Sequence, residues 1–200
     1  MASTPPDLST KLKAVNILLA GLGEQPASTL DTVESSLAEQ AENAIDECSR
    51  QVQLRGWYWN REDDYPLTTN SDDEIALPIN TLVVHEVRGA GDDLVQRGQR
   101  LYNRTDHTYK FTDTDTAYVN LTVYLSWDEL PEFAKQAIFY LAQKRFQMRE
   151  LTSKVIDAAM EEDVAMAFST LEQLEDAQGP ANIVTDTGGL GLYDGGVRRR

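Results

Sequence analysis

The chain changes its hydrophobic periodicity twice, and this change constrains the fold more than any other feature of its 200 residues. Before residue 57 and after residue 127, apolar residues repeat every three or four positions, which places them on one face of an α-helix. Between these positions the helical period gives way to short runs separated by turn-forming residues, which is typical of β-strands. The sequence therefore predicts an α+β protein, with a small antiparallel β domain inserted between the second and third helices.

Four helices are predicted, at about residues 9–22, 28–55, 130–150 and 153–177. The second carries a narrow apolar seam formed by Val33, Leu37, Ala41, Ala44, Cys48 and Val52. The buried stripe of the third is Phe133, Ala137, Ile138, Leu141, Ala142 and Phe146. The inward residues of the fourth are Ile156, Met160, Val164, Ala167, Phe168, Leu171 and Leu174. We expect the first and last helices to meet and hide their stripes, which gives a helical bundle with the β domain at one end.

Six short strands are predicted, at residues 77–79, 81–84, 94–95, 100–102, 108–111 and 118–125. In the last of them two sets of residues alternate, which predicts one buried face and one polar, aromatic face. The predicted buried set is Val119, Leu121, Val123 and Leu125, and the predicted polar set is Tyr118, Asn120, Thr122 and Tyr124.

These patterns divide the chain into a helical bundle domain (residues 1–56 and 128–178), a β domain (57–127) and an extended C-terminal arm (179–200). The arm holds six of the twelve glycines and no apolar stripe. Stretched out, it spans on the order of 70 Å.

The net charge of −15 disfavours a surface that grips nucleic acid, because such surfaces depend on Lys and Arg. The charge is uneven: the arm contains two Asp and three Arg, which gives +1, so the other 178 residues carry −16. A single cysteine and the lack of a signal-peptide pattern predict a protein made in the cytoplasm, and no apolar run is long enough to predict a membrane span.

The sequence contains no catalytic, cofactor or metal motif with the required context or spacing. The Gly21–Pro26 segment follows a predicted helix, whereas a dinucleotide fingerprint follows a strand. His85 and His107 have no partner at metal-ligand spacing, and Cys48 falls on an apolar seam where a thiol is inert. A pair of carboxylates of the glycosidase type could still be hidden among the many acidic residues. The sequence otherwise predicts a protein that is not an enzyme.

The aromatic cluster Trp57-Tyr58-Trp59 lies where the second helix meets the β domain. Two interpretations remain open. The cluster either fixes the angle between the two domains or contacts another subunit, since Trp and Tyr are enriched in interfaces.

Several motifs resemble one family, the tail tubular protein A of short-tailed bacteriophages. They are Ala14-Val15-Asn16-Ile17-Leu18 with the turn Gly21-Leu22-Gly23-Glu24-Gln25-Pro26, the signature Arg55-Gly56-Trp57-Tyr58-Trp59-Asn60 after a long helix, and Leu130-Pro131-Glu132-Phe133 leading to Arg145-Phe146. Their order and spacing carry the resemblance across residues 14–146.

The resemblance implies a structural adaptor of the virion tail, assembled in the host cytoplasm as a twelve-fold ring. It implies two partners besides sister copies, the portal protein and the tail nozzle (tubular protein B), with DNA passing through the channel unbound. We expect Tyr193, Arg198, Arg199 and Arg200 of the arm to bind the portal or a neighbouring copy. Two alternatives stay open: another head-completion or scaffold protein, and a carboxylate-dependent polysaccharide hydrolase.

Overall fold

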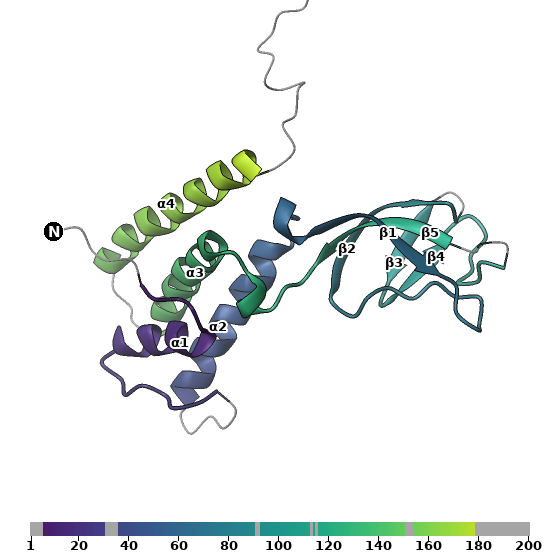
Figure 1. The fold of residues 1–200 in the computed structure, drawn as a ribbon. Helices are drawn as coiled ribbons and strands as arrows, with labels where there is room; N and C mark the ends of the chain where they lie inside the picture. The colour runs from purple at the N-terminus through teal and green to yellow at the C-terminus, as the bar shows by residue number, and fades with distance from the viewer. Residues whose placement is uncertain are drawn as a thin grey trace, which may run out of the picture.

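The computed structural model describes residues 6–30, 36–90, 93–112, 114, 116–150 and 154–178. These residues form a helical part and a β part that extends away from it (Figure 1). The helices are α1 (Lys11–Ala20), α2 (Ser36–Gln53), α3 (Glu132–Glu150) and α4 (Lys154–Gln178). The strands are β1 (Arg61–Thr68), β2 (Thr81–Arg88), β3 (Leu94–Arg97), β4 (Arg100–Asn103) and β5 (Thr116–Val123). The predicted α+β class, with the strands between the second and third helices, is confirmed. The predicted arm, residues 179–200, lies outside the described residues.

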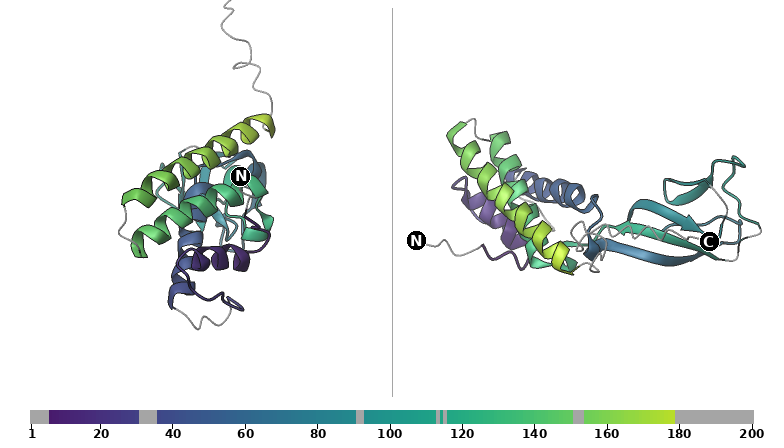
Figure 2. Two further views of the ribbon diagram at one scale, coloured as in Figure 1. Left: turned by 90° about the vertical axis from the view of Figure 1, so that its left-hand side faces the viewer. Right: turned by 90° about the horizontal axis from the view of Figure 1, so that it is seen from above.

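The helical part is built around α2 and α3. Thr10 caps the start of helix α1, because its hydroxyl accepts a hydrogen bond from the backbone N–H of Lys13 at 3.2 Å. The helix packs against α2 and α3. Helix α4 lies along α3, on the side of α3 away from α1 (Figures 1 and 2). The predicted pairing of the first and last helices is therefore not what holds the helical part together. The α3 stripe is wide enough to serve two neighbours, so α4 packs mainly on α3. None of the described helices is both long and apolar enough to cross a membrane.

The predicted stripes of α2 and α3 agree with the observed burial. Ala41, Ala44, Cys48 and Val52 are buried in the helical core, and Leu37 packs against it. In α3 the stripe residues Ala137, Ile138, Ala142 and Phe146 are buried, while Phe133 and Leu141 pack at the margin. Val33 lies outside the described residues. The described part of α2 spans about 27 Å at 1.5 Å per residue.

Helix α4 departs from its predicted pattern. Ala167 and Leu171 are buried, and Met160, Val164 and Phe168 are half-buried. Leu174, however, is 38% exposed, so its prediction as an inward residue is wrong. The reason is that α4 packs on one side only. Its contact stripe is therefore narrower than its apolar stripe.

The β part consists of an antiparallel sheet in the order β1-β5-β2 and a separate hairpin, β3–β4. A second apolar core forms around the central strand β5, with β1 and β2 on either side of it. Its buried members are Leu67, Ile75, Leu77, Ala90, Leu101, Phe111, Ala117, Val119, Leu121 and Val123. Each part of the protein thus has a core of its own.

The alternation predicted for residues 118–125 holds in part: Leu125, predicted to be buried, is half-buried and lies beyond the end of β5. Val119, Leu121 and Val123 are buried, and Tyr118 is 48% exposed on the other face. Thr122, predicted on the polar face, is fully buried. The turn after α2 covers it there.

Three strand predictions require correction. β1 was not predicted, because Leu67 is its only buried residue and its other positions are charged, polar or proline. Its two strand-disrupting features, a bulge after Glu62 and Asp64 at φ 54°, further hide the strand pattern. Residues 77–79 and 108–111 do not form strands, although isolated bridges such as Ala76↔Arg100 and Glu74↔Lys110 attach these regions to their neighbours.

Candidate functional site

The junction between the helical part and the β part is held by several buried side-chain hydrogen bonds. Two segments cross it: residues 54–60 lead from α2 into β1, and residues 124–131 lead from β5 into α3. Two buried amide side chains, Gln53 and Asn60, join these segments.

The Asn60 side chain binds three backbone groups across the junction. Its Nδ2 donates to the carbonyls of Gln53 and Val123, each at 2.9 Å, and its Oδ1 accepts from the N–H of Trp57 at 2.8 Å. One amide therefore ties the end of α2, the turn that follows it and the end of β5 together. Because Asn60 is 1% exposed, an unpaired group left by its removal would be costly.

Gln53 closes the other crossing segment in the same manner. Its Oε1 accepts from the N–H of Leu125 at 2.7 Å, and its Nε2 donates to the carbonyl of Leu125 at 3.0 Å. The same Nε2 also donates to the Ser49 hydroxyl at 2.9 Å. A side-chain amide thus pairs with a backbone amide as a neighbouring strand would. This pairing fixes the exit of β5 against α2.

The three aromatic residues of the junction occupy different environments. Trp57 is 3% exposed within the helical core, and its indole N–H donates to the carbonyl of Val52 at 2.7 Å. The Arg55 guanidinium lies 4.5 Å from the centre of the Trp57 ring. Trp59 packs at the margin of the same core, whereas Tyr58 is 53% exposed.

Helix α4 reaches the junction through its last turns. Arg55 forms an ion pair with Glu172 at 2.6 Å, and the backbone N–H of Tyr58 donates to Oε1 of Glu175. Within the described residues, Oε2 of Glu175 and Nε1 of Trp59 are buried without a hydrogen-bond partner. The α4 contact with the junction is therefore polar and only partly satisfied.

Close packing explains why glycine occupies position 56. Gly56 has a φ of 73°, and a Cβ atom there would lie 2.7 Å from the Thr122 hydroxyl oxygen. That oxygen is in turn 2.7 Å from Nε2 of His85. The turn after α2 thus lies directly on the sheet, and this contact buries Thr122.

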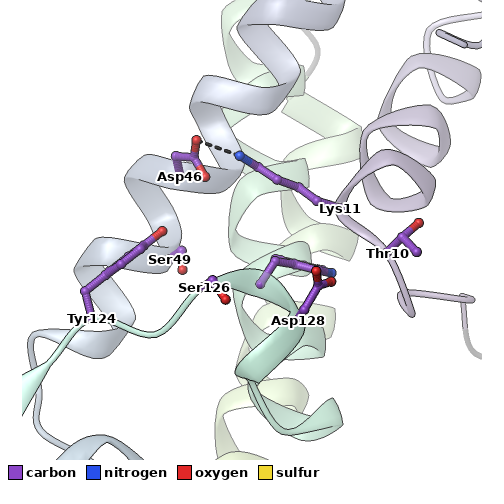
Figure 3. A pocket seen from close by; sticks show the side chains of 8 residues that line it. Thr10, Lys11, Asp46, Ser49, Tyr124, Ser126 and Asp128 are labelled. Carbon is purple, nitrogen blue, oxygen red and sulfur yellow. Dashed lines mark hydrogen bonds and ion pairs between the residues drawn. The ribbon is translucent and has the colours of Figure 1, made fainter. Parts of the chain in front are cut away.

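A polar pocket of about 450 Å³ opens beside the junction, between α1, α2 and the segment that follows β5 (Figure 3). Its lining residues are Thr10, Lys11, Asp46, Ser49, Tyr124, Ser126, Trp127 and Asp128. Lys11 forms ion pairs with Glu42 and Asp46, each at 2.8 Å, and these hydrogen bonds outweigh burial and raise the pKa of Lys11. The Lys11 ammonium is therefore already engaged on the pocket wall.

The described residues show no arrangement suited to catalysis. No group of three or more His, Cys, Asp or Glu side chains among them is placed to hold a metal ion. Burial raises the pKa of the Cys48 thiol to about 11, so the thiol stays protonated at neutral pH. The pKa values of Glu129 and Glu161 are lowered by hydrogen bonds from Ser126 and Lys144, whereas a general acid needs a raised pKa.

Some of the site residues predicted from the sequence lie together in the structure, and others lie outside the described residues. Trp57, Tyr58 and Trp59 all lie at the junction, while Tyr193, Arg198, Arg199 and Arg200 lie outside the described residues. Sequence reasoning missed Gln53 and Asn60. Two signals could have indicated them. Gln53 is a polar residue close to the expected end of the helix, and Asn60 follows Trp57 by three positions.

The comparisons with known proteins agree with this non-catalytic geometry. No curated protein matches the chain. The sequence model of a family described as "Tail tubular protein" matches residues 12–181, which covers both parts of the fold. The chain therefore belongs to the tail tubular protein family, and it is a structural, non-enzymatic component of a phage virion tail.

Proposed function

We propose that the chain is the adaptor subunit of the tail: a ring of copies, twelve in number, that joins the portal protein to the tubular nozzle and lets DNA pass during ejection. The observation that carries this proposal is a family assignment over 170 residues combined with an elongated two-part shape (Figures 1 and 2). A subunit with two separately cored ends can hold a different partner at each end.

The bonding at the junction supports a role in transmitting position. An adaptor must fix the distance and angle between its two partners, and that requires a stiff connection. Gln53 and Asn60 provide it through buried hydrogen bonds to both crossing segments. We assign residues 1–56 and 128–178 to portal and sister contacts, and residues 57–127 to nozzle contacts.

The charge of the chain suits a channel through which DNA moves without being held. The net charge of −15 repels the phosphate backbone, so a lumen lined by this protein has no strong binding sites for DNA. The C-terminal arm supplies the opposite sign locally. We propose that Arg198, Arg199 and Arg200, with Tyr193, hold the portal or a neighbouring copy.

The test is assembly with the portal protein of the same phage. When the two proteins are mixed at equal subunit ratio, we expect them to co-sediment, and electron microscopy of the complex should show a closed ring on the portal. Failure to co-sediment at any ratio contradicts the proposal. A sugar-release assay on the isolated chain, which we expect to be negative, tests the polysaccharide hydrolase alternative.

A further inference from the structure

The exposed surface where α2 meets the last turns of α3 carries a surplus of positive charge. Arg145 and Arg149 are one helical turn apart on α3, and both form ion pairs with the same oxygen of Glu47 on α2, at 3.9 Å and 2.8 Å. One carboxylate thus serves two guanidinium groups. Met148, which lies between the arginines in sequence, is 56% exposed. We call Arg145, Met148 and Arg149 the basic face.

Helix α4 presents the complementary chemistry. From residue 155 to residue 178 it contains seven acidic residues and no basic one. Glu162 and Asp163 are exposed, and no cation among the described residues pairs with either of them. Met166, one turn further along, is 63% exposed. We call Glu162, Asp163 and Met166 the acidic face.

The two faces match in charge and in their exposed methionines. Each has two like charges within four residues of a methionine, so two such helices can bring the methionines together with opposite charges beside them. Arg145 also donates to Oε1 of Gln51, whereas Arg149 pairs with Glu47 alone among the described residues, so donors of Arg149 remain for an approaching carboxylate. The flexible methionine side chains adapt readily to each other.

We propose that the acidic face of one copy binds the basic face of the next copy around the ring. The two surfaces differ, so the contact is head-to-tail, and repeated head-to-tail contacts generate a closed ring when the rotation between neighbours closes. This inference rests on the proposed ring and adds the pair of surfaces that builds it. A second copy is the favoured partner because a single chain carries both halves of the contact.

Paired charge reversals test this assignment. The first variant carries Arg145→Glu and Arg149→Glu, the second carries Glu162→Lys and Asp163→Lys, and a third carries all four substitutions. We expect each of the first two to form rings on the portal at least about tenfold less well, since like charges then face each other. The four-substitution variant restores opposite charges and should assemble as the unmodified chain does.

Mixing gives an independent and sharper readout. In an equimolar mixture of the first two variants, every contact between unlike neighbours is again complementary, so rings should reform with the two variants in alternation. Matched controls make the same changes of net charge in the β part, away from the portal and sister contacts: Arg104→Glu with Lys110→Glu, and Glu62→Lys with Asp72→Lys, all at exposed positions. These controls should assemble normally, and circular dichroism should show that every variant is folded.

The outcomes separate the two proposals. If the unmodified chain forms no ring with the portal, the adaptor function is wrong and this inference is lost with it. If that ring forms and the charge-reversed variants assemble equally well, only the pairing of faces is wrong. The pairing is also wrong if the separate variants fail and neither the mixture nor the four-substitution chain recovers assembly.

Discussion

Trp57 and Tyr58 are neighbours in sequence with opposite environments, and the difference lies in how the chain leaves α2. Gly56 takes a positive φ, which turns the backbone so that the Trp57 ring enters the helical core and Tyr58 points outward. Three hydrogen bonds between the Asn60 side chain and backbone groups hold this turn. Side-chain identity alone would not separate the two aromatic residues.

Removal of the Trp57 ring should destabilise the protein strongly. We expect Trp57→Ala to lower the free energy of unfolding by about 3–5 kcal/mol, because a buried indole and its hydrogen bond to Val52 are lost. Tyr58→Ala, at an exposed position, should cost less than about 1 kcal/mol. Urea unfolding followed by circular dichroism measures both. Equal losses for the two variants contradict this placement of Trp57.

Cys48 should resist thiol reagents in the folded protein. Its side chain is fully buried, and with a pKa of about 11 roughly one thiol in a thousand is ionised at pH 8. We expect alkylation at pH 8 to be slow in buffer and fast in denaturing urea, and mass spectrometry of the adduct gives the rates. Rapid labelling of the native chain would reveal a reactive thiol and reopen the question of a cysteine nucleophile.

At the level of elements, the predictable features are those that a single element determines. The predicted seams of α2 and α3 agree with the structure because most of their apolar residues are buried or lie at the margin of the core. β1 was not, because its position depends on hydrogen bonds to β5 and only Leu67 enters the core. Gln53 and Asn60 escaped for a related reason: their partners Leu125 and Val123 are distant in sequence.

Helix α4 illustrates the limit of stripe analysis, and its two leucines allow a matched test. Leu171 is fully buried in the helical core, whereas Leu174, on the same predicted stripe, is 38% exposed. We expect Leu171→Ala to cost about 2–5 kcal/mol, and Leu174→Ala to cost under about 1 kcal/mol. Thermal unfolding of the two variants under identical conditions measures the difference. A larger effect at Leu174 would mean that α4 packs in another orientation.

Across the whole molecule, the acidic charge determines what the contacts between copies must provide. Like charges on an acidic chain oppose self-association, so the contacts that hold a ring together must offset this repulsion locally. The helical part contains one such device in the pairing of its basic and acidic faces. The three arginines that end the chain offer another, on a segment with a charge opposite to that of the body.

Deletion of residues 181–200 should therefore separate folding from assembly. The described helical and β cores are formed by residues between Leu8 and Leu171, so we expect the shortened chain to unfold at the same temperature as the full chain. Its ring formation on the portal should weaken, and the difference between the two chains should shrink as salt is raised, because screening removes the electrostatic share of the arm's contribution. Co-sedimentation with portal over a salt series measures this effect.

A matched variant, Arg198→Gln with Arg199→Gln and Arg200→Gln, keeps the arm and removes only its charge. If this variant assembles like the full chain while the deletion does not, the arm binds through other residues; if both assemble normally at moderate salt, the arm has no role in holding the ring.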